Sequence, residues 1–216
     1  MMQIEENGHQ MGFLRKFMME NAGAAAAKRI EEKYAPVWFL DTDYKKILVF
    51  AGLGNNGGDG LVIARHLAGY GANVTVFLLG KPDNIRSEEC SWNWSLLEKM
   101  KSVKLLTGGN LEDLNNLKFK IIIDGILGTG ISGEIREPHA SAIEFINGKV
   151  WGGVVAVDVP SGLNPDTGEA NKRCVNANMT VTFHRMKVGM QKRTDVCCEI
   201  FVEKIVSPPE AEIGVL

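Results

Sequence analysis

Three segments of the chain place polar side chains directly after apolar runs, and chemistry is expected at these positions. They are GLGNNGGDG from Gly52 to Gly60, DGILGTGISGEIREP from Asp124 to Pro138, and DVPSGLNPDTG from Asp158 to Gly168. The apolar runs before them are typical of strands that are buried on both faces. Ligands of open α/β sheets bind outside the carboxyl ends of the strands, so the three segments predict one binding site.

The first segment has five glycines in nine residues, which lets backbone N–H groups converge on a phosphate at the start of a helix. It lacks the GK[ST] sequence of an NTPase P-loop. It also lacks the acidic residue that holds a ribose about 20 residues further on, because the next strand ends in Leu79-Gly80-Lys81. A standard NAD dehydrogenase is therefore disfavoured. A plain strand-to-helix turn is the alternative to a ligand site.

The side-chain oxygens of the three segments suit a hard cation rather than zinc. Asn56, Asp124 and Ser161 offer oxygen ligands only, and a buried Asp124 carboxylate needs partners. Capping of a neighbouring turn is the alternative role for Asp124. Ser161 does not lie in the GxSxG elbow of a hydrolase, and the four histidines show no triad spacing, so serine hydrolase chemistry is not expected.

The elements that position these segments alternate along the chain. Strands are expected at Lys46–Ala51, Asn73–Leu79, Val103–Leu106, Lys120–Asp124 and Gly153–Asp158. Helices are expected at Phe13–Tyr34, Leu61–Ala68, Arg86–Met100 and Ala140–Ile146. This alternation predicts an α/β fold, a three-layer α/β/α Rossmann-like sandwich with a mainly parallel sheet.

Two further features qualify this pattern. Met179–Phe183 and Glu199–Ile205 look like strands without a helix between them, so we expect them to pair as a ribbon that extends the sheet. Gly23 lies inside the first helix, where it weakens the helix unless another element approaches closely. His184, beside the first of these strands, is expected to be structural rather than catalytic.

The composition excludes several classes of protein. The chain has 216 residues and a formal net charge of −2, with 45% hydrophobic and 23% charged residues. No apolar run reaches the ~18 residues of a membrane span, and the N-terminus lacks a signal-peptide core. Four cysteines without CxxC spacing indicate neither a disulfide scaffold nor a zinc site. The near-neutral charge argues against nucleic-acid binding. We expect one cytoplasmic domain over residues 1–216.

Together the motifs resemble the YjeF N-terminal domain family, whose enzymatic members are NAD(P)H-hydrate epimerases. Five blocks match in the same order: MENAG (Met19–Gly23), GLGNNGGDGLVIARHL (Gly52–Leu67), DGILGTGISGEIREP (Asp124–Pro138), AVDVPSGLNPDTG (Ala156–Gly168) and TVTFHRMKVG (Thr180–Gly189). The resemblance implies an isomerase that interconverts the R and S forms of hydrated NADH and NADPH, called NADHX and NADPHX. Many microbial members are fused to a hydrate dehydratase, which is therefore the implied functional partner.

The resemblance also implies roles for individual residues. Those implied to bind substrate are Asn55, Asn56, Gly57, Gly58, Asp59, Gly128, Thr129, Gly130, Ile131, Ser132, Gly133, Glu134 and Asp158. Asn56, Asp124 and Ser161 are implied to hold one potassium ion per subunit, which agrees with the oxygen-only set. A homodimer is expected, because members of the family usually form dimers.

The chemistry of this substrate defines what the site must do. The hydrate carries a hydroxyl at C6, beside the ring nitrogen, whose lone pair can expel the protonated hydroxyl. Water that returns on the other face gives the other epimer. This reaction needs a proton-transfer group and a negative charge near the cationic intermediate. Asp158 is expected to supply both, and Lys187 a proton-transfer or phosphate-binding role. A solvated surface position is the alternative for Lys187.

Two other functions compete with the epimerase. Divergent members of the family serve as protein-interaction or RNA-processing scaffolds, but a scaffold has no need of the set Asn56, Asp124 and Asp158. An ordinary nucleotide-dependent oxidoreductase is disfavoured by the missing ribose-binding acid.

Overall fold

The computed structural model describes residues 2–108, 110–130, 133–149, 151–205 and 208–215. In these residues the sheet has seven parallel strands in the order β3-β2-β1-β4-β5-β6-β7. The strands are β1 Lys46–Ala51, β2 Asn73–Leu79, β3 Val103–Gly108, β4 Ile121–Gly125, β5 Gly153–Val157, β6 Met179–Phe183 and β7 Glu199–Glu203. The α-helices are α1 Met2–Gln10, α2 Arg15–Trp38, α3 Asn55–Gly69, α4 Glu88–Leu97, α5 His139–Asn147 and α6 Thr194–Cys197. Short 3₁₀ turns include η1 Thr42–Lys45, η2 Pro82–Asn84, η3 Leu111–Leu114, η4 Val188–Met190 and η5 Pro209–Glu212.

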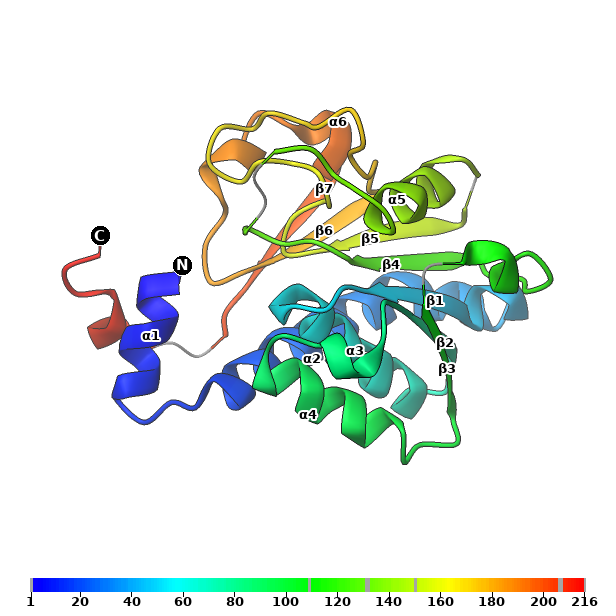
Figure 1. Ribbon diagram of the computed structural model, residues 1–216, viewed down its shortest axis with the longest axis horizontal. Helices are drawn as coiled ribbons and strands as arrows, with labels where there is room; N and C mark the ends of the chain where they lie inside the picture. The colour runs from blue at the N-terminus through cyan, green and yellow to red at the C-terminus, as the bar shows by residue number, and fades with distance from the viewer. Residues whose placement is uncertain (1, 109, 131–132, 150, 206–207, 216) are drawn as a thin grey trace.

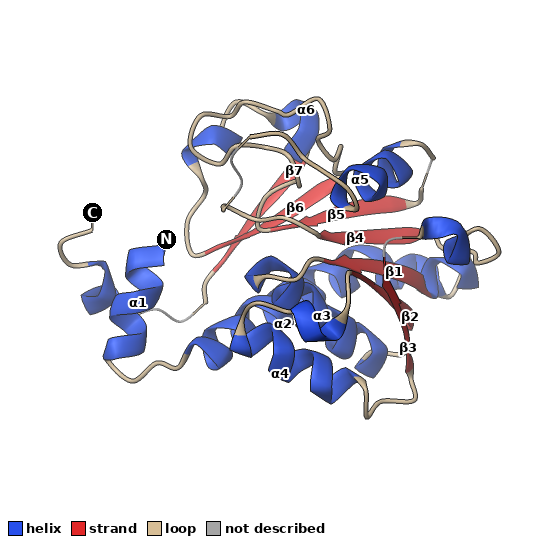
Figure 2. Ribbon diagram, viewed as in Figure 1, coloured by secondary structure: helices blue, strands red, loops and turns tan. Residues whose placement is uncertain are grey.

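Helices cover both faces of the sheet. Figures 1 and 2 show α2, α3 and α4 on one face and α5 and α6 on the other. Side chains of β1 alternate between the faces, because successive residues of a strand point to opposite sides. Ile47 and Val49 enter the core beneath α2 and α3, whereas Leu48 and Phe50 enter the core beneath α5. The predicted three-layer α/β/α sandwich is confirmed, and the sheet is parallel throughout the described residues.

The strand order brings the three polar segments together. β1 lies between β2 and β4, and the chain leaves β1 toward α3 on one face but leaves β4 toward α5 on the other. Such a switch point opens a crevice at the carboxyl ends of the strands. Across it, the N–H of Gly52 donates a hydrogen bond of 2.9 Å to the Gly125 carbonyl. The first and second segments therefore start in direct contact.

Helix α3 begins earlier than predicted. The sequence predicted a helix from Leu61, whereas the helix starts at Asn55, after an extended Gly54. A glycine-rich stretch has low helix propensity, but backbone packing overrides it here. A Cβ on Gly57 would come within 1.9 Å of the Gly52 carbonyl oxygen, so only glycine fits. The polar residues after Gly54 thus form the first turn of a helix rather than a loop.

The last two strands are also arranged differently from the prediction. As predicted, β6 and β7 pair and extend the sheet. They are parallel neighbours joined by a crossover, however, and not the two strands of a ribbon. Residues 184–198 connect them through η4 and α6. A parallel crossover needs about a dozen residues, and such short turns carry no periodic signal that the sequence could reveal.

The two ends of the chain meet beside the sheet. Figure 1 shows α1 next to the C-terminal turn η5 at one end of the molecule. Asn7 Nδ2 donates a hydrogen bond of 2.9 Å to the Ala211 carbonyl, and Glu212 forms an ion pair with Arg185. His184 Nε2 lies 3.0 Å from Glu212 Oε1 and His184 is buried. The C-terminal turn thereby ties α1 to the end of β6.

Helices α2 and α3 approach each other closely at Gly23. A Cβ at this position would lie 2.4 Å from Val62 Cβ and 3.1 Å from the Asp59 carbonyl oxygen. The sequence predicted that a glycine here needs a close neighbour, and the structure supplies it. The contact sets how near α2 lies to the first turns of α3.

We expect Gly23→Ala to lower the free energy of unfolding, because overpacking of a tight core contact typically costs about 1–3 kcal/mol. Gly69→Ala is the matched control, since the space around a Cβ at Gly69 is open. Urea denaturation of both variants measures the difference. Equal midpoints for Gly23→Ala and Gly69→Ala would contradict the assigned contact.

Candidate active site

A cavity of about 350 Å³ opens at the carboxyl edge of the sheet, a volume typical of ligand pockets. Its lining residues are Glu5, Gly54, Asn55, Asn56, Asp59, Arg86, Ile126, Leu127, Gly128, Thr129, Gly130, Asp158, Phe183 and Lys187. Eight of them were predicted as site residues: Asn55, Asn56, Asp59, Gly128, Thr129, Gly130, Asp158 and Lys187. The three segments singled out in the sequence therefore contribute to one cavity.

The N-terminus of α3 faces this cavity. Asn55 and Asn56 are its first residues and both line the cavity. The free N–H groups and the dipole of a helix N-terminus favour an anion such as phosphate. Gly57 and Gly58 are buried, and a Cβ on Gly58 would come within 2.6 Å of Met19 Cε. These two glycines shape the turn without lining the cavity, so their binding role remains a prediction.

Asp158 lies on the cavity wall next to Lys187. Its carboxylate accepts hydrogen bonds from Thr182 Oγ1 at 3.0 Å, from the Phe183 N–H at 3.2 Å and from Lys187 Nζ. Lys187 also donates to Thr182 Oγ1 at 2.9 Å and to the Phe183 carbonyl at 3.1 Å. Lys187 is buried, which excludes a solvated surface position. Among the described residues these bonds all end on Oδ1, so Oδ2 is left for a ligand.

The backbone at Asp158 is left-handed, with φ 63°. This conformation is strained for a residue other than glycine, and such strain is concentrated at functional sites. The Asp158 N–H is satisfied by the Val181 carbonyl at 2.8 Å. The strained turn ends β5 and directs the side chain toward the cavity.

Asp124 and Ser161 join the second and third segments. The Ser161 N–H donates to Asp124 Oδ2 at 2.8 Å, and its hydroxyl donates to Asp124 Oδ1 at 2.6 Å. The Ile126 N–H donates to Asp124 Oδ1 at 3.2 Å, and the Leu127 N–H donates to Ser161 Oγ at 2.9 Å. Asp124 and Ser161 are both fully buried. Two of the three predicted ion ligands are therefore in direct contact.

The donor set fits a potassium ion. Burial raises the pKa of Asp124 to about 6 against the opposing hydrogen bonds from Ser161 and Ile126, which are all neutral donors. Asn56 approaches from α3: a Cβ on Gly128 would lie 3.4 Å from Asn56 Oδ1. Asn56 Nδ2 is buried, and no described residue pairs with it. A monovalent cation among these oxygens would offset the buried charge of Asp124.

The second segment is only partly built into the cavity. Gly128, Thr129 and Gly130 line it, whereas the predicted Ile131 and Ser132 lie outside the described residues. Gly133 and Glu134 are exposed and are not among the residues that line the cavity. The Gly133 carbonyl instead accepts a hydrogen bond of 3.2 Å from Asn171 Nδ2. Their substrate-binding role remains a prediction.

The sequence did not predict six of the lining residues as site residues: Glu5, Gly54, Arg86, Ile126, Leu127 and Phe183. Arg86 stands at the rim, where its Nη2 would be 3.9 Å from a Cβ on Gly54. A guanidinium there can hold a phosphate in two-pronged fashion. In the sequence, Arg86 stood out only as the first residue of an expected helix. Glu5 lies on α1, in an opening segment to which the sequence assigned no role.

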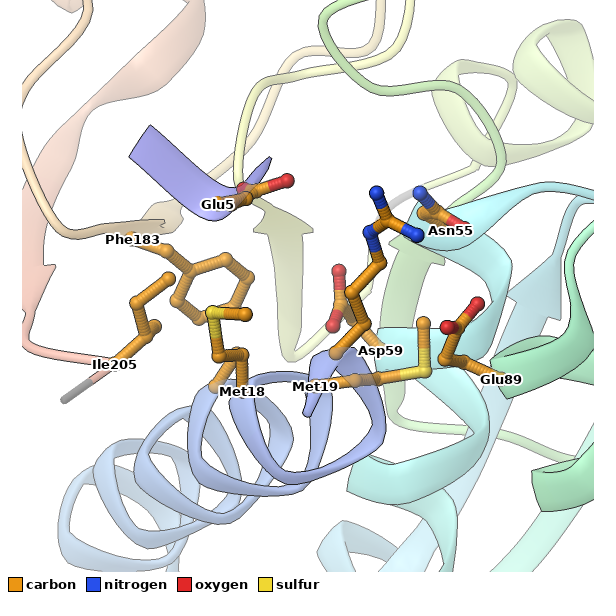
Figure 3. Close-up of a pocket in the computed structure, with 10 residues that line it drawn as sticks. Glu5, Met18, Met19, Asn55, Asp59, Glu89, Phe183 and Ile205 are labelled. Atoms are coloured by element: carbon orange, nitrogen blue, oxygen red, sulfur yellow. The ribbon is translucent and has the colours of Figure 1, made fainter. Parts of the chain in front are cut away.

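A smaller cavity of about 70 Å³ shares Glu5, Asn55, Asp59 and Phe183 with the first. Figure 3 shows Glu5 from α1 and Asp59 from α3 around this space, with Met18 and Met19 beneath them. Its remaining lining residues are Arg15, Met18, Met19, Ala22, Glu89 and Ile205. The two carboxyl groups therefore stand where a polar cavity meets an apolar annex.

Comparison with known proteins places this geometry in a family. The sequence profile described as YjeF-related protein N-terminus matches residues 15–189. The chain belongs to this family. It is 62% identical to the NAD(P)H-hydrate epimerase of Nitrosopumilus maritimus over 100% of this chain and 97% of that one.

Two further relatives of the YjeF N-terminal family show how widely the domain is used. The bifunctional NAD(P)H-hydrate repair enzyme Nnr of Hyperthermus butylicus is 42% identical over 98% of this chain, which spans 38% of that protein. The crystal structure of the yeast protein ynu0 superposes with a TM-score of 0.70 at 30% identity, covering 82% of this chain and 74% of the yeast chain. None of the helices in the described residues combines the length and hydropathy needed to cross a bilayer.

Proposed function

We propose that this protein is an NAD(P)H-hydrate epimerase, which interconverts the R and S forms of NADHX and NADPHX. The observation that carries the proposal is the ion pair of the partly buried Asp158 with the buried Lys187, on the wall of a cavity that the N-terminus of α3 faces. Relatives named NAD(P)H-hydrate epimerase are 62% and 60% identical over the whole chain. The proposal therefore rests on both the site and its close relatives.

The cavity can hold such a dinucleotide by its charged groups. The phosphates fit the N-terminus of α3, where Asn55 and Asn56 line the cavity, and the Arg86 guanidinium stands at the same rim. Backbone N–H groups, a helix dipole and a guanidinium together favour phosphate strongly. Gly128 and Thr129 also line the cavity. In this proposal their backbone contacts the part of the dinucleotide that lies beyond the phosphates. This arrangement directs the nicotinamide ring toward Asp158.

Asp158 performs the proton transfer in this proposal. In its acidic form it protonates a C6 hydroxyl on its own face of the ring, which leaves as water while the ring nitrogen lone pair forms the iminium. As a carboxylate it stabilises that cation, and for the other epimer it accepts a proton from the water that adds to this face. Lys187 fixes the orientation of the carboxylate through Oδ1 and Thr182. Oδ2 is thereby presented to the substrate.

We also propose one potassium ion per subunit, held by Asn56, Asp124 and Ser161. Bound there, potassium supplies the positive charge that the buried Asp124 carboxylate lacks. Asp124 and Ser161 belong to the second and third segments, and Asn56 belongs to the first turn of α3. The same residues therefore hold the phosphate-binding turn in register with the wall that carries Asp158.

Three finer proposals rest on the family alone. An NAD(P)H-hydrate dehydratase is the functional partner, since the bifunctional repair enzymes of Hyperthermus butylicus and Methanothermobacter thermautotrophicus contain a domain 42% identical to this chain. We propose a homodimer, as the resemblance to the family implies, and a cytoplasmic location. Size-exclusion chromatography with light scattering measures the mass of the protein in solution and so tests the homodimer.

The activity is expected without any nucleoside triphosphate. Purified protein mixed with chromatographically separated (R)- or (S)-NADHX and NADPHX should restore the equilibrium mixture of epimers. Chiral liquid chromatography follows both epimers against a buffer blank, because hydrates also equilibrate slowly unaided. Rates equal to the blank for both nucleotides would exclude the epimerase.

Asp158→Asn is expected to lower turnover about 10²–10⁴-fold, the usual contribution of general acid–base catalysis. The affinity for the hydrate should change far less, because the phosphates are held by α3 and Arg86. Asp166→Asn, an exposed aspartate of the same segment, is the matched control. Turnover by Asp158→Asn close to that of Asp166→Asn would move the proton transfer to another group.

Potassium is expected to raise the melting temperature more at pH 8 than at pH 5. Because the folded-state pKa of Asp124 is raised to about 6, the potassium-free protein loses stability as pH rises through that value. Below it the carboxyl is neutral and needs no cation. When the potassium concentration is a hundred times the Kd of the site, binding adds about 2.7 kcal/mol to the free energy of unfolding.

Differential scanning fluorimetry in potassium or tetramethylammonium chloride at equal ionic strength measures this effect. Asp124→Asn should melt alike in both salts at both pH values. A wild-type curve that is the same in the two salts at pH 8 would remove the cation site from the proposal.

A further inference from the structure

Asp59 and Glu5 are two carboxyl groups of the cavity to which the mechanism assigns no chemistry. Asp59 lies on the second turn of α3, and Glu5 lies on α1. Figure 3 shows both around the annex, with the ring of Phe183 and the side chain of Met18 nearby. Both also line the larger cavity that holds Asp158. The site therefore contains three carboxyl groups and one buried lysine.

These carboxyl groups differ in their surroundings. Oδ1 of Asp158 is saturated by Lys187, Thr182 and the Phe183 N–H. Within the described residues, the Asp59 carboxyl forms no hydrogen bond or ion pair. Burial and the negative charges of Asp158 and Glu5 raise the pKa of Asp59 well above its ordinary value, although Lys187 opposes this. The Asp59 carboxyl, which has no such partner among the residues described, and the ion-paired Asp158 carboxylate are therefore suited to opposite proton-transfer roles.

Epimerisation at one carbon makes a demand that one acid does not meet. The hydroxyl leaves from one face of the nicotinamide ring, and water must add to the other face. A fixed carboxyl on one side can assist departure or addition on that side only. Unless the ring turns over inside the site, a second proton-transfer group is needed across the ring plane.

We propose that Asp59 is a second catalytic residue, which donates and accepts the proton on the face of the nicotinamide ring opposite Asp158. The inference rests on the proposed epimerase function. Asp59 enters the cavity from α3, on one side of the sheet, whereas Asp158 enters from the end of β5 beside Lys187. A planar ring held between these elements has one carboxyl on each face.

The bonds and protons balance in this scheme. The neutral Asp59 gives its proton to the C6 hydroxyl, the C6–O bond breaks, water leaves, and the nitrogen lone pair forms the C=N bond of the iminium. A water on the other face then forms the new C6–O bond and gives its proton to the Asp158 carboxylate. The reverse direction exchanges the two roles, and solvent restores the starting protonation between turnovers.

Asp59 rather than Glu5 is assigned this role because α3 holds it in place. Asp59 lies one helical turn after Asn55, on the same face of α3, and both line the cavity. The Asp59 carbonyl is packed beneath α2, where Gly23 leaves room for it. Glu5 belongs to α1, which packs on the C-terminal turn η5 rather than on the sheet.

The test separates exchange of the C6 hydroxyl from epimerisation. Each pure epimer is incubated in H₂¹⁸O with wild type, Asp59→Asn and Asp158→Asn, and mass spectrometry of the separated epimers follows both processes. In wild type, incorporation of ¹⁸O accompanies epimerisation. In Asp59→Asn we expect epimerisation to fall about 10²-fold or more, while the epimer whose hydroxyl faces Asp158 still exchanges its oxygen.

In Asp158→Asn the other epimer should be the one that exchanges. Asp43→Asn, at the opposite edge of the sheet in η1, is the matched control and should behave as wild type. Parallel loss of exchange for both epimers in Asp59→Asn would show that Asp59 only binds substrate, and would overturn the proposal. If Glu5→Gln, and not Asp59→Asn, loses epimerisation while one epimer still exchanges its oxygen, the second catalytic residue is Glu5 and the proposal is overturned. Wild type that epimerises neither hydrate would instead refute the proposed function itself.

Discussion

The buried carboxylate of Asp124 is the point on which the site depends. It binds the Ser161 N–H and hydroxyl through separate oxygens, and Ser161 in turn binds the backbone of Leu127. These bonds join the segment after β4 to the segment after β5 in a region without solvent. Breaking them would leave a charge buried without partners, which typically destabilises a protein strongly. The positions of Asp158 and of the Gly128 turn both follow from this joint.

Backbone contacts that admit no side chain complete the joint on the other side. A Cβ on Gly52 would lie 2.0 Å from the Ile126 carbonyl oxygen. The turn before α3 is thereby pressed against the segment that Asp124 holds. The glycines that suggested a phosphate cradle in the sequence thus have a packing role first. Anion binding at the helix N-terminus follows from that packing, because it exposes the first turn of α3 to the cavity.

The sequence predicted the elements whose pattern is local. The strands Lys46–Ala51 and Asn73–Leu79 are found within the predicted bounds, because a continuous apolar run between turn residues has few other structures open to it. The start of α3 and the crossover between β6 and β7 were missed, because tertiary packing decides both. Asp158 was predicted at the end of a buried strand and lies there. Glu5 and Arg86 reach the cavity through contacts between distant parts of the chain, which no local pattern encodes.

Helix α1 stands apart from the sheet and is held chiefly by η5, through contacts such as that of Asn7 with the Ala211 carbonyl. A unit attached in this way opens at a smaller free energy than the whole fold. Its opening removes one wall of the cavity while the strands stay paired. A ligand that touches Glu5 and Asn55 together closes that wall. Amide hydrogens in the first ten and last few described residues would then exchange more slowly when the cavity is filled, so the two termini report on occupancy of the site.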